Sequence, residues 1–299
     1  MPFTDLISCT TLSAHLQDAG WVVIDCRHDL TDPERGRREY AESHIPGAHF
    51  LHLDHDLAGH PEGMPARGGR HPLPQPQAFA QRMQRLGVGP GSQVIAYDAQ
   101  GGMVAARLWW MLRHWAGHSA VSVLDGGWQA WTTAALARSS DIAAVTPAIE
   151  SFVFKSLQHS VDAAWLLQQL DSPTLCLIDA RAPDRFRGQN ETLDPVGGRI
   201  PGARNRFFRD NLQADGRFKP ASQLRSEYLA LLDGLSPDQS VHQCGSGVSA
   251  CHNILAMEVA GMSGMRLYPG SWSEWCADAS RPIATGEPTD IAGATPSRT

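Results

Sequence analysis

A cysteine in a glycine-rich segment carries the strongest chemical signal in the sequence. Cys244 opens the run Cys-Gly-Ser-Gly-Val-Ser-Ala at 244–250, which follows a predicted strand at 240–243 and opens a predicted helix at 248–260. A glycine-rich turn between a strand and a helix points several backbone N–H groups inward and forms a cradle for an anion. The helix N-terminus adds partial positive charge. A thiolate there is stabilised and its pKa is lowered, so we predict that Cys244 is a nucleophile.

The other five cysteines are predicted to be packing residues. Cys251 and Cys276 lie in helical segments, and Cys9, Cys26 and Cys176 have no comparable loop. No two cysteines form a C-x-x-C pair, so the pattern indicates neither a zinc knuckle nor a redox dithiol. Free thiols are typical of a cytoplasmic protein, and the N-terminal segment has neither the basic nor the apolar region of a secretory signal.

The elements around the nucleophile belong to an internal repeat. Blocks 22–27, 44–48 and 126–131 return as blocks 176–181, 199–203 and 270–275. The nearly constant offset predicts a duplicated domain, since the period is too long for a solenoid. We therefore predict a first domain at 1–140, a second domain at 155–285 and a flexible tail at 286–299.

Apolar segments and helical patterns alternate within each copy. The predicted strands are 21–25, 93–97, 121–124, 174–179, 240–243 and 265–268, and the predicted helices are 77–86, 103–115, 128–133, 161–170, 222–232 and 248–260. Continuous apolar strands that alternate with helices predict an α/β fold, with a parallel sheet flanked by helices in each domain. Ligands of such sheets bind beyond the carboxyl ends of the strands, which is where Cys244 lies.

Composition excludes several classes of function. The 299 residues are 42% hydrophobic and 19% charged, and the formal net charge is −6. The hydrophobic content excludes a disordered chain, and the negative charge argues against a nucleic-acid or anionic-membrane partner. The apolar runs are too short to span a bilayer.

A cysteine in an anion cradle also suggests a phosphatase or an arsenate reductase. Cysteine-dependent phosphatases use a Cys-x5-Arg signature, because the arginine binds the phosphate in a bidentate manner. The corresponding position in this sequence is Ala250. A loop without that arginine would hold a phosphate dianion poorly, so this alternative is disfavoured.

Over residues 5–285 the chain resembles the tandem-domain sulfurtransferases of the rhodanese family. The motifs that carry the resemblance are the strand ends at 24–25 and 178–179, His-Ile-Pro-Gly-Ala at 44–48, Gly-Arg-His-Pro-Leu-Pro at 69–74, the Cys244 loop, and the Gly-Gly-Trp and Gly-Ser-Trp turns at 126–128 and 270–272. The resemblance implies two rhodanese-like domains, of which the first is catalytically silent. Asp98 aligns with Cys244 in the first copy, and we interpret it as a structural loop residue.

The implied activity is transfer of sulfane sulfur. Cys244 would become a persulfide and pass the outer sulfur to a thiol or cyanide, with no cofactor and with a thioredoxin-like reductant as a candidate partner. A persulfide-relay binding module is the alternative from another class. An intact nucleophile and two domains favour the free-standing enzyme.

The loop composition bears on the sulfur donor. Thiosulfate-preferring members resemble Cys-Arg-Lys-Gly-Val-Thr, whereas Gly245 and Ser246 are neutral here. The pattern is similar to that of members that use 3-mercaptopyruvate, a monoanionic keto acid, so thiosulfate is the alternative donor. The expected substrate-binding residues of the loop are Gly245, Gly247, Val248, Ser249 and Ala250.

The resemblance also implies polar partners for the donor. Arg185 matches the first of two carboxylate-binding arginines, but the run 190–195 lacks the second, for which Arg187 and Arg199 are candidates. Ser246 is expected to act with His71 and Asp54 of the first domain, which would protonate the leaving enolate.

Histidines cluster between His52 and His60 in a segment that is predicted to be a loop. Their spacing does not match a helix-face pair of metal ligands such as H-E-x-x-H. We therefore predict no functional metal site in this segment.

Overall fold

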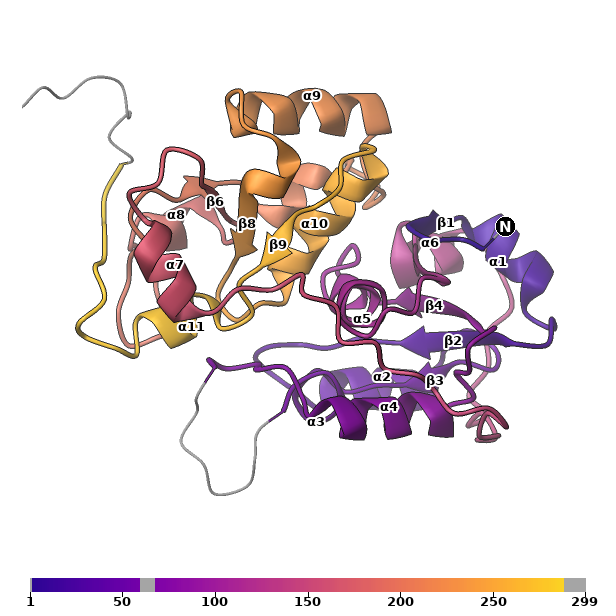
Figure 1. The fold of residues 1–299 in the computed structure, drawn as a ribbon. Coiled ribbons are helices and arrows are strands. Elements are labelled where there is room, and N and C mark those ends of the chain that lie inside the picture. The colour runs from indigo at the N-terminus through magenta and orange to yellow at the C-terminus, as the bar shows by residue number, and fades with distance from the viewer. Residues whose placement is uncertain (1, 60–67, 288–299) are drawn as a thin grey trace, which may run out of the picture.

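The computed structural model describes residues 2–59 and 68–287, so most of the predicted flexible tail lies outside the described residues. Two sheets occupy separate halves of the molecule (Figure 1). The first has the strand order β1-β5-β4-β2-β3 and the second β7-β6-β8-β9, and every pairing between strands is parallel. The predicted α/β class, with a parallel sheet and flanking helices in each half, is confirmed.

The strands are short and, in the centre of each sheet, completely buried. Their bounds are β1 Leu6–Ile7, β2 Trp21–Asp25, β3 His49–Phe50, β4 Gln93–Tyr97, β5 Val121–Leu124, β6 Cys176–Asp179, β7 Arg204–Asn205, β8 Ser240–Gln243 and β9 Arg266–Leu267. Every residue of β4 and of β8 is buried, as expected for a strand that helices cover on both faces. The two-residue strands β1, β3 and β7 were not predicted.

The helices agree with most of the predicted positions. Their bounds are α1 Cys9–His15, α2 Arg35–Glu42, α3 Leu53–Asp56, α4 Pro76–Arg85, α5 Ala105–Trp110, α6 Gly127–Thr133, α7 Ala163–Gln169, α8 Pro183–Phe186, α9 Ala221–Leu232, α10 Ser249–Val259 and α11 Ser271–Trp275. The predicted helix 103–115 begins at Ala105 and continues as a π-helix, Met111–Trp115. Two short 3-10 helices lie at Phe208–Asn211 and Pro237–Gln239.

The two halves share one hydrophobic core. Helix α5 of the first half packs against α10 of the second (Figure 1). Leu108 and Trp109 of α5 belong to the same buried cluster as Ile254 and Leu255 of α10. Because α10 begins immediately after the Cys244 loop, this contact fixes that loop against the first half. No helix in the described part of the chain is both long and apolar enough to cross a bilayer.

Candidate active site

Cys244 lies at the carboxyl end of β8, one loop before α10. Its side chain is buried, with 2% of the residue exposed. The Ser246 N–H points at Cys244 Sγ over 3.5 Å, and the Cys244 N–H donates to Ser271 Oγ over 3.1 Å. The loop is tied down further by the N–H of Trp272, which donates to the Cys244 carbonyl. Cys244 is therefore held at the strand end of a hydrogen-bonded loop that leads into α10, which is the position that the sequence predicts for it.

The loop depends on a glycine at position 247. Gly247 has a φ of +77°, and a Cβ there would stand 2.3 Å from the Pro269 carbonyl oxygen. Any other residue would be strained and would push β9 and its following turn away from the loop. This close approach explains why a glycine stands three positions after Cys244 in the motif.

A row of three polar side chains borders the cysteine loop. Ser246 Oγ lies 2.6 Å from His71 Nδ1, and His71 Nε2 lies 2.9 Å from Asp54 Oδ1. Burial lowers the pKa of His71 below the ordinary value of 6.5, and the hydrogen bond from His71 lowers the pKa of Asp54. The ionised Asp54 carboxylate accepts the proton on Nε2, so Nδ1 of the neutral ring accepts from the Ser246 hydroxyl. The structure thus brings together the three residues that sequence reasoning grouped.

Arg107 in α5 is a buried cation that sequence analysis did not identify. Its Nη1 donates to the Gly247 carbonyl over 3.0 Å, and its Nη2 donates to the His71 carbonyl over 3.0 Å and to Leu57 over 3.4 Å. The residue is completely inaccessible to solvent. Arg107 therefore ties the cysteine loop of one domain to the histidine loop of the other. An arginine inside an otherwise apolar helical pattern was the signal that could have revealed it.

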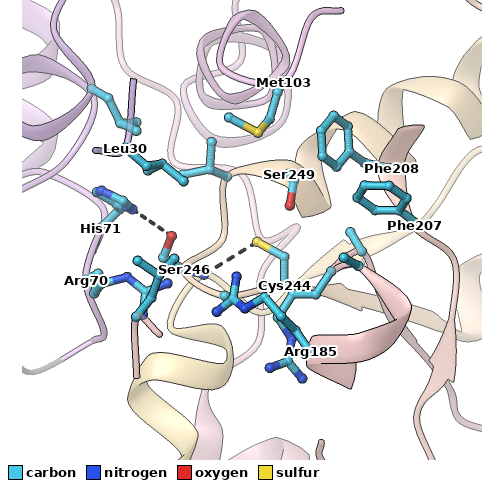
Figure 2. A pocket seen from close by; sticks show the side chains of 17 residues that line it. Leu30, Arg70, His71, Met103, Arg185, Phe207, Phe208, Cys244, Ser246 and Ser249 are labelled. Atoms are coloured by element: carbon cyan, nitrogen blue, oxygen red, sulfur yellow. Dashed lines mark hydrogen bonds between the residues drawn. The ribbon is translucent and has the colours of Figure 1, made fainter. Parts of the chain in front are cut away.

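A cavity of about 160 Å³ lies beside Cys244, Ser246 and His71 (Figure 2). Of the predicted site residues, the lining contains His71, Arg185, Cys244, Gly245, Ser246, Val248 and Ser249. The side chain of Ala250 is buried in α10, and Gly247 faces Arg107 instead of the cavity. Sequence analysis did not identify the apolar walls of Leu30, Met103, Leu193, Phe207 and Phe208, which come from both domains.

The arginines of the site are held by carboxylates. Arg185 donates from Nη2 to both oxygens of Glu191 over 2.8 and 2.9 Å, and also reaches Asp194 over 3.4 Å. Arg70, from the first domain, also lines the cavity and donates to Asp194.

The two arginines that sequence analysis offered as a second carboxylate ligand lie elsewhere. Arg187 pairs with Glu287 over 3.4 Å. Arg199 stacks on Phe186 and donates to the carbonyls of residues 286 and 287. Neither belongs to the cavity lining, so this structure does not place either candidate where it could bind a donor carboxylate in the cavity.

The corresponding loop of the first domain holds an anion of its own. The Asp98 carboxylate is completely buried. It accepts the backbone N–H groups of Gln100, Gly102, Val104 and Ala105 over 2.7–3.0 Å. A carboxylate with four N–H donors fills the cradle that the strand–loop–helix geometry creates. The interpretation of Asp98 as a structural residue agrees with these contacts.

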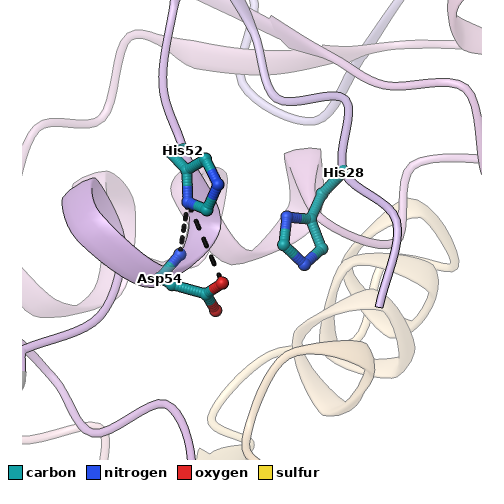
Figure 3. A group of neighbouring side chains, drawn as sticks. All are labelled: His28, His52 and Asp54. Carbon is teal, nitrogen blue, oxygen red and sulfur yellow. Dashed lines mark hydrogen bonds and ion pairs between the residues drawn. The ribbon is translucent and has the colours of Figure 1, made fainter. Parts of the chain in front are cut away.

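His28, His52 and Asp54 form a group with ligand atoms close enough to approach one metal ion (Figure 3). Both ring nitrogens of His52 are engaged, however. Nδ1 accepts the Asp54 N–H over 3.1 Å, which caps α3, and Nε2 lies 3.0 Å from the Pro33 carbonyl. A metal would have to break these contacts, so the absence of a functional metal site stays our prediction. His60 of the same segment lies outside the described residues.

Comparison with known proteins agrees with this geometry. The model of the rhodanese-like domain matches residues 8–134 and 162–278. The chain is 47% identical over 292 residues to "Probable 3-mercaptopyruvate sulfurtransferase" of Pseudomonas aeruginosa, covering 96% of this chain and 100% of the relative. It is 33% identical to the thiosulfate sulfurtransferase of Bos taurus, covering 86% and 85%. The structure of 3-mercaptopyruvate sulfurtransferase from Leishmania major superimposes with a TM-score of 0.82 at 29% identity, covering 94% and 76%. The chain therefore belongs to the rhodanese family, and it is a tandem-domain sulfurtransferase.

Proposed function

We propose that this enzyme moves sulfane sulfur from 3-mercaptopyruvate to a thiol or cyanide through a persulfide on Cys244. The observation that carries the donor assignment is the row Ser246–His71–Asp54 beside the sulfur. A keto acid that loses its sulfur leaves an enolate, which needs a proton, whereas thiosulfate leaves sulfite, which needs none. A proton relay next to the nucleophile therefore assists the reaction of 3-mercaptopyruvate and has no role in the reaction of thiosulfate.

The donor step transfers one sulfur atom and one proton. The Cys244 thiolate attacks the donor thiol sulfur, an S–S bond forms, and the C–S bond breaks with its electron pair left on carbon. The sulfur is oxidised to the sulfane level and the carbon is reduced. Ser246 and His71 take up the thiol proton and return it to the enolate carbon, which yields pyruvate and the persulfide anion.

In the acceptor step, a thiolate or cyanide attacks the outer sulfur of the persulfide. The S–S bond breaks, and its electron pair regenerates the Cys244 thiolate. The products are the acceptor persulfide or thiocyanate, and no further oxidant or reductant is consumed. A thioredoxin-like dithiol could serve as the thiol acceptor. We place the reaction in the cytoplasm, where the six unpaired cysteines would stay reduced.

Steady-state kinetics with each donor test this proposal. We expect a higher kcat/KM for 3-mercaptopyruvate than for thiosulfate. The donor-treated enzyme should gain about 32 Da by intact-mass spectrometry, as a covalent intermediate requires. Cys244→Ser should gain nothing and should be inactive. Labelling of another cysteine would refute the nucleophile, and a preference for thiosulfate would refute the donor. Formation of the persulfide on Cys244 without turnover of small thiols would favour a persulfide-relay module.

A further inference from the structure

Two arginines from opposite domains meet above the residue that follows the nucleophile. A Cβ at Gly245 would stand 2.7 Å from Nη2 of Arg70 and 3.7 and 3.8 Å from the two Nη atoms of Arg185. Arg70 comes from the first domain, and its backbone N–H donates to Ser273 Oγ in α11 of the second. The absence of a side chain at Gly245 is what lets the guanidinium group of Arg70 approach the loop this closely, whereas Arg185 lies at ordinary contact distance.

Acidic residues orient this pair. Asp194 accepts from Arg70 and lies 3.4 Å from Nη2 of Arg185. Glu191 engages Nε and Nη2 of Arg185, and both Nη atoms of Arg185 lie near Gly245. Glu191 and Asp194 are nearly inaccessible, with 5% and 3% of their side chains exposed. Both arginines therefore have fixed partners that aim them at the cavity.

The charges of this cluster favour a singly charged ligand. Among the described residues lining the cavity, the cations are Arg70, Arg181 and Arg185. In the same described part of the chain, the carboxylates that pair with them are Asp179, Glu191 and Asp194. Against these three pairs, one added carboxylate brings one further negative charge, and a dianion brings two. Repulsion by the buried acids thus penalises thiosulfate more than a keto acid.

We propose that Arg70 is a substrate-binding residue that closes over Gly245 and, together with Arg185, binds the donor carboxylate. The inference rests on the proposed function, because it needs a donor that carries a carboxylate. The distance from the donor sulfur at Cys244 to the donor carboxylate at the two arginines is short, because Gly245 adjoins Cys244 in the loop and the donor has three carbons. The first domain then contributes to donor specificity as well as to proton transfer.

The test compares two donors that differ only in the carboxylate. Arg70→Met should raise KM for 3-mercaptopyruvate about tenfold, the low end for a hydrogen bond to a charged group, because the side chain is partly exposed. The variant should leave KM for 1-mercaptopropan-2-one, which lacks the carboxylate, unchanged. Arg187→Met is the matched control, since Arg187 pairs with Glu287 outside the cavity, and it should behave as wild type with both donors.

A second variant tests the same contact by changing the loop residue instead of Arg70. Gly245→Ala places a methyl group where the tip of Arg70 lies, so it should raise KM for 3-mercaptopyruvate in the same direction. Combined with Arg70→Met, it should add little, because both changes remove one interaction.

The outcomes separate this inference from the proposed function. If the wild type does not turn over 3-mercaptopyruvate, the proposed function fails and the role of Arg70 fails with it. If the wild type uses that donor but Arg70→Met matches Arg187→Met, only the role of Arg70 is overturned. An equal rise in KM for 1-mercaptopropan-2-one would also overturn it, because the effect would then not depend on the carboxylate.

Discussion

Replacing Asp98 with alanine should damage the fold of the first domain and spare the chemistry of the second. The carboxylate is buried and accepts four backbone N–H groups. Its removal leaves four buried donors unsatisfied, at about 1 kcal/mol or more for each. We therefore expect Asp98→Ala to lose roughly 4 kcal/mol of unfolding free energy, a large part of the 5–15 kcal/mol typical of a folded protein.

Urea denaturation followed by circular dichroism and tryptophan fluorescence measures this loss. Asp141→Ala is the control, because Asp141 is an exposed acid of the same half. The kcat per folded molecule of Asp98→Ala should stay close to wild type, since Asp98 is not among the residues that line the cavity. Added sulfate should stabilise Asp98→Ala more than the control, because an anion can occupy the vacated cradle.

Two results would refute this reasoning. Equal urea midpoints for Asp98→Ala and Asp141→Ala would show that the four N–H groups find other partners at no cost. A fall in kcat per folded molecule of more than about a hundredfold, roughly 2.7 kcal/mol of barrier, would show that the first loop takes part in catalysis.

Two further predictions concern the polar contacts between the domains. Since the pKa of His71 is lowered and its neutral form accepts the Ser246 proton, activity should persist as the pH falls to 6.5 and decline only below it. Asp54 raises the pKa of His71, so in Asp54→Asn the acid limb of the pH profile of kcat/KM should move to lower pH, and the plateau value of kcat/KM should fall. An acid limb that stays in place would contradict the assignment of Asp54 as the partner of His71. Arg107→Met should lower the unfolding free energy by about 3–5 kcal/mol, because three buried carbonyls lose a charged donor, and should reduce kcat at least tenfold, roughly 1.4 kcal/mol. Arg107→Lys should recover part of both, and a Met variant with normal stability would contradict the role of Arg107.

The parts of the fold that depend on local sequence could be predicted. The apolar runs of β2, β4 and β8 and the turn chemistry around Cys244 leave signals within a few residues of the element they specify. Strands of two residues, such as β1, are too short for any periodicity. The π-helical turn, in which the Ala116 N–H donates to the Met111 carbonyl, has no distinct sequence pattern either.

The candidate site was predictable where one segment contains the arrangement, or where the resemblance supplies the partners, as it does for His71 and Asp54. Cys244 and Ser246 share a loop, and Arg185 lies in a motif that the resemblance covers. The roles of Arg70 and Arg107 depend on how two domains dock, and docking is set by the packing of α5 on α10 rather than by spacing. The acid Asp194 likewise acquires a partner from more than a hundred residues away.

The division of the polar row between domains has a consequence for how the enzyme is made. Ser246 belongs to the half that carries Cys244, and His71 and Asp54 belong to the other half. A single chain presents one half to the other at a high effective concentration, so the row assembles by an intramolecular step. Under the proposed mechanism, the two copies therefore depend on each other. The first copy is more than an inert duplicate in that mechanism, because it holds two of the three groups that would transfer the proton.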